Sequence, residues 1–357
     1  MKLGFGLYRH QLNAEHFRFA RQCGATHLVI HLVDYFRSSR RNQPGDQPLG
    51  DDAGWGLAGD PDQLWTFEEI ATIQKEAAAH GLQIEAIENF DPAHWHDVLL
   101  DGPKKAQQLE NLKTIIRTVG RVGIPVIGYN FSLAGVAGRV KGAWGRGGAE
   151  VVGMDGAYDK PIPKGMIWNM VYDKNAPAGN LAPITAEELW RRHGEFLDAL
   201  IPVAEEAGVT LAAHPDDPPT PTVRGQPRLV NQPQLYQKLI DRRPSPRNAL
   251  EFCLGTLAEM PEGNIYDAVE TYSRQRKLAY VHFRNVRGKA PHYQETFVDE
   301  GDIDMLRVLR ILKRNGFTGV LIPDHAPQMT CAAPWHAGMA YACGWMQAAL
   351  KIVETNL

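Results

Sequence analysis

The stretch that decides the fold is LAAHPDD, residues 211–217. Small and apolar residues up to Ala213 give way abruptly to His214, a proline and two acids. Such a change is typical of a buried strand that runs into a polar loop. Amphipathic patterns precede and follow it, at residues 186–207 and 234–242, so the stretch reads as the strand of one β-α unit.

The same unit recurs along the chain. Short runs rich in valine, isoleucine and aromatic residues predict eight strands, at residues 2–7, 27–31, 83–87, 125–129, 210–213, 249–252, 279–283 and 319–322. Amphipathic patterns predict helices at residues 14–23, 67–80, 105–122, 186–207, 234–242, 265–274, 303–315 and 337–353. A glycine follows five of these helices, at Gly24, Gly81, Gly123, Gly208 and Gly316, as a left-handed cap requires. The repeat predicts an α/β fold, a (β/α)8 TIM barrel.

Two connections are longer than a minimal barrel needs. They cover about residues 34–65 and 130–185, and we interpret them as insertions after the second and fourth strands. Loops that follow strands lie on the carboxyl face of a barrel, where ligands bind. Neither contains a linker or a second core, so we expect one TIM-barrel domain over residues 1–357. Long face loops also favour subunit contacts, and we expect a homo-oligomer.

Composition argues against several classes of protein. Hydrophobic residues make up 44% and charged residues 22% of the sequence, the balance of a globular protein. A formal net charge of -3 gives no electrostatic reason to bind nucleic acid or an anionic membrane. The four cysteines include no CxxC pair, and the first residues read as a strand rather than a secretory signal. We therefore expect a cytoplasmic protein.

Four potential metal ligands occupy the same position in consecutive β-α units. His214, Cys253, His282 and Asp324 each lie at or just after the end of a predicted strand, on four consecutive strands. One such histidine is usually structural, and one buried cysteine is usually core. Four together favour a metal site at the mouth of the barrel. The mixed nitrogen, sulfur and oxygen set suits Mn²⁺, Fe²⁺ or Zn²⁺ better than Mg²⁺ or Ca²⁺.

Around these residues the chain resembles the mannonate dehydratase family over nearly its whole length. The resemblance rests on the motifs GIPVIGYNF (123–131), HPDDPP (214–219), GQPR (225–228), FCLGT (252–256), VHFRNV (281–286) and PDH (323–325). It implies a Mn²⁺-dependent dehydratase that converts D-mannonate into 2-dehydro-3-deoxy-D-gluconate in hexuronate breakdown, with Fe²⁺ or another divalent metal as an alternative. It also implies that His214, Cys253, His282 and Asp324 bind the metal.

The sequence departs from the family pattern around the substrate. Ile322 stands where the family has an arginine before PDH, and Val298 stands where a histidine follows the Glu-Thr pair. A segment that normally carries a tyrosine reads CAAPWH, residues 331–336. Tyr8, Tyr129 and His336 are candidate replacements for that tyrosine. The ligand set is kept while parts of the substrate shell differ, as a change of substrate or of reaction would require.

The candidate catalytic residues are His325 and the ligand Asp324 beside it. Imidazole titrates near neutral pH, so His325 is the candidate acid or base, with orientation of Asp324 as its alternative role. The expected substrate contacts are arginines that grip a carboxylate and polar groups that bind hydroxyls. These are Asn130, Arg139, Arg228, Arg284 and Tyr8. Glu88 is either a further substrate contact or a buried structural acid, and Asp216 and Asp217 are candidate supports of the ligands.

Three functions fit the pattern. The first is dehydration of D-mannonate or a close analogue. The second is a metal-dependent isomerase or epimerase of the xylose-isomerase-like barrels, in which a proton moves between adjacent carbons. The third is a non-catalytic protein that binds a sugar acid. In each case the partner is a small sugar acid or sugar, without nucleic acid or membrane.

Overall fold

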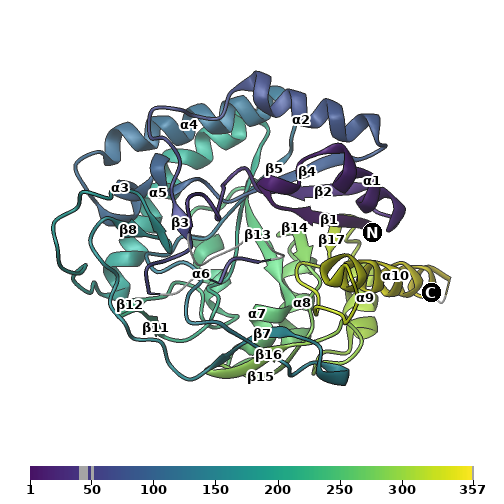
Figure 1. Cartoon of the computed structure of the whole chain (residues 1–357). Coiled ribbons are helices and arrows are strands. Elements are labelled where there is room, and N and C mark those ends of the chain that lie inside the picture. Colours follow the sequence, from purple (N-terminus) through teal and green to yellow (C-terminus); the bar gives the residue numbers. More distant parts are fainter. Residues whose placement is uncertain (40–46, 50–51, 356–357) are drawn as a thin grey trace.

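The computed structural model describes residues 1–39, 47–49 and 52–355. Eight parallel strands close into a barrel in the order β1-β17-β14-β13-β10-β5-β4-β2 (Figure 1). Their bounds are β1 (Lys2–Leu7), β2 (His27–Ile30), β4 (Gln83–Glu88), β5 (Val126–Tyr129), β10 (Thr210–Ala213), β13 (Asn248–Cys253), β14 (Leu278–His282) and β17 (Val320–Ile322). The predicted (β/α)8 barrel is confirmed, with each strand within two residues of its predicted bounds.

Helices surround the barrel and pack on the outer faces of the strands. They are α1 (Ala14–Gln22), α2 (Phe67–Ala79), α3 (His96–Leu100), α4 (Lys105–Val122), α5 (Ala186–Ala207), α6 (Leu235–Arg242), α7 (Leu254–Glu259), α8 (Ile265–Arg274), α9 (Met305–Arg314) and α10 (Pro334–Thr355). The expected caps are present, since Gly123 and Gly208 end α4 and α5 with φ of 91° and 72°. Helices α3 and α7 were not predicted, because stretches of five and six residues are too short to show an amphipathic period.

Two layers of apolar side chains hold this arrangement. A large cluster fills the space between strands and helices, and a small one fills the barrel itself. Ala86, Ala212, Tyr280 and Ile322 belong to the small cluster, so the strand faces alternate between the interior of the barrel and the helices. No helix among residues 1–39, 47–49 and 52–355 is long and apolar enough to cross a membrane.

The connections at the carboxyl face pair with one another. The connection after β2 contributes β3 (Gly56–Leu57) and the one after β5 contributes β6 (Val140–Gly142), β7 (Val151–Asp155), β8 (Met166–Ile167) and β9 (Met170–Val171). The remaining short strands are β11 (Thr222–Val223), β12 (Gln226–Pro227), β15 (Val286–Lys289) and β16 (His292–Glu295). Because β3 pairs with β9 and β7 with β16, backbone hydrogen bonds join loops that lie far apart in the sequence. They form a wall around the mouth of the barrel (Figure 1).

Candidate active site

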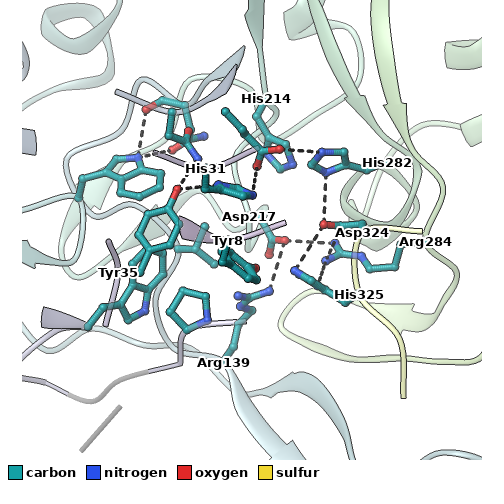
Figure 2. Close-up of a pocket in the computed structure, with 17 residues that line it drawn as sticks. Tyr8, His31, Tyr35, Arg139, His214, Asp217, His282, Arg284, Asp324 and His325 are labelled. Atoms are coloured by element: carbon teal, nitrogen blue, oxygen red, sulfur yellow. Dashed lines mark hydrogen bonds and ion pairs between the residues drawn. The ribbon is translucent and has the colours of Figure 1, made fainter. Parts of the chain in front are cut away.

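A pocket opens at the carboxyl ends of the strands (Figure 2). Most of the residues predicted for the site line it: Tyr8, Asn130, Arg139, His214, His282, Arg284, Asp324 and His325. Glu88 and Asp217 line it as well. Cys253 is fully buried next to His214 and His282, whereas Arg228 lies behind the wall.

The structure brings the four predicted metal ligands together. One ligand atom from each of His214, Cys253 and His282 lies within 4.8 Å of the other two. Asp324 completes the group, with its Oδ1 3.5 Å from His282 Nδ1. The barrel register places them, since Cys253 and His282 are direct neighbours on β13 and β14. Asp324 has a φ of 63°, a strained backbone conformation that is characteristic of functional sites.

The surroundings decide which nitrogen of each histidine is available. His214 Nδ1 lies 2.6 Å from the carbonyl oxygen of Pro215, so this nitrogen carries the proton and Nε2 the lone pair. His282 Nε2 lies 3.2 Å from a carboxylate oxygen of Glu88 and 3.3 Å from one of Glu251, so its lone pair is on Nδ1. That buried Nδ1 makes no hydrogen bond to any residue in the described part of the chain. These are the two nitrogens that an ion would bind, once they have released any proton they hold.

The charges of the cluster also fit a divalent ion. Burial raises the pKa of the Cys253 thiol, but Arg284 and the two histidines lower it by more, so that the pKa is about 5. Burial likewise raises the pKa of Asp324, and His325 and His282 bring it well below its usual range. Burial lowers the pKa of His214, but Cys253 and Glu251 raise it by more, to about 9, so the cluster without an ion holds protons that a divalent cation would displace. After that release, a thiolate, a carboxylate and two neutral imidazoles would carry the charge that balances the cation. The residues present therefore fit a divalent metal.

The side chains of two acids and a tyrosine lie next to His282. Glu251 is buried, and burial followed by the nearby Glu88 raises its pKa to about 8. The hydroxyl of Tyr280 donates to Glu88 at 3.4 Å. Gly128 on β5 makes room, because a Cβ there would come within 2.3 Å of both Glu251 and Tyr280. Glu251 and Tyr280 were missed, although each precedes a ligand by two positions in a strand and so faces the same side.

Arg284 is the centre of a buried ion-pair network. Its Nη2 lies 3.1 Å from Asp217 and 3.2 Å from Glu259, and its Nη1 lies 2.9 Å from Glu295. The predicted role of Arg284 was to grip a substrate carboxylate, yet these donors already face protein carboxylates. Glu259 and Glu295 were not predicted as site residues. Glu295 lies on β16, outside the barrel, so the barrel repeat gave no signal for it.

Of the other predicted substrate contacts, some line the pocket and one does not. Arg139 lines the pocket, with its Nη1 3.5 Å from Glu295. Arg228 points into the wall, where it donates to Ser132 and to three backbone carbonyls and pairs with Asp216 at 3.2 Å. Its position favours a structural role over substrate contact. Asn130 lines the pocket, but its Oδ1 accepts a hydrogen bond from the indole of Trp168 at 3.2 Å.

His325 lies beside the ligand cluster. Its Nδ1 is 3.0 Å from a carboxylate oxygen of Glu295, and its Nε2 is 3.4 Å from Asp324. Burial lowers the pKa of His325, while Asp324 and Glu295 raise it by more. With Nδ1 donating to Glu295, the imidazole presents Nε2 to the pocket as a group that can take up or release a proton.

Aromatic side chains form the facing wall of the pocket. Tyr35, Trp55 and Trp168 line it together with His31 and Tyr8. Of these five residues only Tyr8 was predicted, because the others lie on the long connections or within a predicted strand. Two further candidates lie elsewhere. The hydroxyl of Tyr129 pairs with His193 on α5, and His336 packs against Phe19 and Trp335. Ile322 is buried in the small barrel cluster.

Comparison with known proteins agrees with this geometry. The family model for D-mannonate dehydratase (UxuA) matches residues 1–171 and 178–348. The mannonate dehydratase of Streptococcus suis is 32% identical over 286 residues, which cover 74% of this chain and 75% of that protein. The chain belongs to the mannonate dehydratase family. Its enzyme class is therefore that of the hydro-lyases acting on sugar acids, as the motifs predicted.

A further relative and two solved structures resemble this mannonate dehydratase family member, and the two structures share its fold. The mannonate dehydratase of Lactococcus lactis subsp. cremoris is 29% identical over 74% of this chain and 79% of that protein. The crystal structure of mannonate dehydratase from Streptococcus suis serotype 2 superposes with a TM-score of 0.75 and 25% identity, covering 99% of this chain and 94% of that one. An L-ribulose 3-epimerase, at a TM-score of 0.57 and 15% identity over 99% of this chain and 96% of that one, shares the barrel.

Proposed function

We propose that this chain removes water from D-mannonate or a close analogue and forms 2-dehydro-3-deoxy-D-gluconate, with Mn²⁺ as the resident ion. The observation that carries the proposal is the state of the two histidines. His214 and His282 each commit one nitrogen to a protein acceptor, and a ligand atom of each lies within 4.8 Å of the Cys253 sulfur. Such second contacts orient metal-binding histidines and fix their tautomers. Fe²⁺ is the alternative ion for the same donor set.

The dehydration needs a base for the proton beside the carboxylate and an acid for the departing hydroxyl. When bound, the ion supplies positive charge for the substrate carboxylate and for the enolate that forms beside it. His325 is placed to take the carbon-bound proton once its Nε2 has released the proton that it shares with Asp324, 3.4 Å away, because Glu295 holds its Nδ1. Arg139 lines the same pocket and adds positive charge for the acid substrate.

The aromatic wall supplies the shape of the site. Trp168 and Trp55 meet edge to face with ring centres 5.3 Å apart, and Trp168 lies 5.9 Å from Tyr35. These rings present apolar faces to the carbon skeleton of a sugar acid, while the ligand cluster holds its polar end.

The test is product analysis with metal-loaded protein. A panel of aldonates and aldoses is incubated with the Mn²⁺ protein, and products are followed by mass spectrometry and by an assay for 2-keto-3-deoxy acids. We expect one aldonate to lose 18 mass units with Mn²⁺, and no turnover after chelation. A change without loss of mass would instead identify an isomerase or epimerase. Tight binding without turnover would identify a sugar-acid binding protein.

We also propose that the protein self-associates through the mouth loops. Val140 and Trp144 lie on or next to the edge strand β6 and are 46% and 39% exposed. An exposed strand edge with apolar side chains favours pairing with another chain. Light scattering of the wild type and of Trp144→Ser tests this, with a monomeric wild type contradicting the proposal.

A further inference from the structure

We propose that Tyr35 is the acid that protonates the departing hydroxyl of the substrate. The inference rests on the proposed dehydration, which requires such a group in addition to the base. Tyr35 lies on the connection after β2, on the pocket wall formed by the aromatic side chains, whereas His325 follows β17 (Figure 2). The two residues therefore approach a bound sugar acid from different strands of the barrel.

The hydroxyl of Tyr35 is held from two sides. The side chain of Asn89 donates a hydrogen bond to it at 3.1 Å, and His31 Nδ1 lies 3.0 Å away. Asn89 has a left-handed backbone, with a φ of 67°, directly after the end of β4. Asparagine tolerates this conformation better than most residues, but it still costs free energy. The structure thus holds Asn89 in a strained position that supports the hydroxyl.

The ring of Tyr35 is fixed as well. It meets Trp55 edge to face at 5.4 Å and Tyr8 edge to face at 5.9 Å. His31, its hydrogen-bond partner, stacks on Tyr8 at 4.7 Å. A catalytic proton donor must be held to within a fraction of an ångström, and packing of this kind provides that order.

The environment keeps Tyr35 in its proton-donating form. Burial raises the pKa of Tyr35 well above its usual value, and the negative charge of Glu88 raises it further. Glu88 lies 3.8 Å from His31 Nε2 and keeps the imidazole proton there, so in the free protein the Tyr35 hydroxyl donates to His31 Nδ1. Rotation about the phenol C–O bond redirects this hydrogen to the departing oxygen of the substrate, and the Asn89 amide stabilises the phenolate left after transfer.

The other tyrosines near the site are engaged elsewhere. Tyr280 donates to Glu88 beneath the ligands, and Tyr293 donates to Asp217 at 3.1 Å. Tyr129 faces α5, where its hydroxyl meets His193. Tyr8 lines the pocket, so it is the competing candidate and belongs in the test.

His325 takes the proton from carbon 2, and the electron pair of that bond forms the double bond between carbons 2 and 3. The bond between carbon 3 and its hydroxyl breaks, and the departing oxygen takes the phenol proton of Tyr35 and leaves as water. The enol formed becomes the 2-keto acid by proton transfer. The proton on His325 returns to the Tyr35 phenolate through water, so the enzyme is regenerated.

The experiment compares Tyr35→Phe with the wild type as Mn²⁺ proteins on the active aldonate. Loss of a general acid lowers a rate by about 10²–10⁴-fold. We expect kcat to fall at least a hundredfold, while KM and bound Mn²⁺ stay within about twofold. Tyr129→Phe also removes a buried tyrosine hydroxyl, but outside the pocket, and should retain wild-type kcat. It is the matched control.

A second substrate separates acid catalysis from a structural role. Fluoride leaves carbon 3 with less help from an acid than hydroxide does, so the 3-deoxy-3-fluoro analogue should restore most of the rate of Tyr35→Phe relative to the wild type. An equal loss on both substrates would overturn the proposal, as would a kcat within threefold of the wild type or a loss confined to Tyr8→Phe. If the wild type forms no 2-keto-3-deoxy acid, the proposed dehydration itself fails.

Discussion

The imidazole Nε2 of His282 lies 3.2 Å from Oε2 of Glu88, at the end of a strand four positions away in the barrel order, on the opposite side of the barrel. Glu88 keeps its charge there. Burial raises its pKa, but His31 and His282 lower it by more, so that the pKa is about 2. The carboxylate therefore holds the proton of His282 on Nε2 and orients the ring so that Nδ1 points to the ligand cluster.

Removing this acceptor should weaken metal binding. Partners of metal-binding histidines typically contribute 10–100-fold to affinity. We expect Glu88→Leu to weaken Mn²⁺ binding by about that factor, and Glu88→Gln, which keeps an acceptor, by less. Competition with a chelator measures the affinity. Glu85→Gln is the control, because Glu85 lies on the same strand but lines a different pocket, together with Lys2 and residues of α2. Unchanged affinity in Glu88→Leu would show that Glu251 alone orients His282.

Arg284 should prove to be a stabilising residue. Its guanidinium contacts Asp217, Glu259 and Glu295, and its side chain is 1% exposed. Breaking a buried pair costs about 3–5 kcal/mol, because it leaves charges without a partner. Arg284→Met should lower the free energy of unfolding by about this amount in urea titrations. Arg284→Lys keeps the charge and should lose less.

The same variants distinguish the role predicted from the sequence. A residue that grips the substrate carboxylate leaves the fold intact when it is replaced and raises KM instead. If Arg284→Met unfolds like the wild type but shows a KM at least tenfold higher, Arg284 binds substrate. Loss of stability in both variants, with Met the more severe, supports the ion-pair network.

The sequence predicted those features that the barrel repeat itself encodes. His214, Cys253 and His282 were found because each ends a strand, and parallel strands of a closed barrel bring their carboxyl ends to one face. Strand alternation could have added Glu251, two positions before Cys253 on β13.

The remaining residues come from contacts that no local pattern records. Glu295 reaches Arg284 from the pairing of β15 with β16, and Trp168 reaches the pocket from a turn between β8 and β9. Tyr35 meets Asn89 although the two are far apart in the sequence. Side chains on long connections are placed by tertiary contacts, so the sequence indicated that these loops bind ligands but not which residues do so.

Asn130 should act on the substrate through Trp168. The indole nitrogen of Trp168 donates to the backbone oxygen of Asn130 at 3.1 Å and to its Oδ1 at 3.2 Å. A hydrogen bond of this kind contributes about 1 kcal/mol. Asn130→Ala should therefore raise KM about fivefold with little change in kcat, and acrylamide should quench the tryptophan fluorescence more strongly. A raised KM with unchanged quenching would mean that Asn130 binds a sugar hydroxyl directly.

His193 should make the stability of the protein depend on pH. It is fully buried on α5, and its Nδ1 has no hydrogen-bond partner among the described residues. Burial, followed by the charge of Arg242, lowers the pKa of His193 to about 3. The unfolded chain takes up a proton at this position below about pH 6.5, whereas the folded protein does not until about pH 3. The contribution of a neutral His193 is thus fully present above pH 6.5 and declines as the pH falls toward 3.

His193→Gln removes this titration and keeps an acceptor for the hydroxyl of Tyr129. Below pH 6.5 the wild type should lose about 1.4 kcal/mol of unfolding free energy per pH unit relative to the variant. Urea titrations at pH 7.5, 6.0 and 5.0 measure it, and the shift between the first and last should be about 2 kcal/mol. Above pH 7 the difference should be constant, which serves as the internal control. A difference that stays constant down to pH 5 would show that His193 takes up a proton in the folded protein.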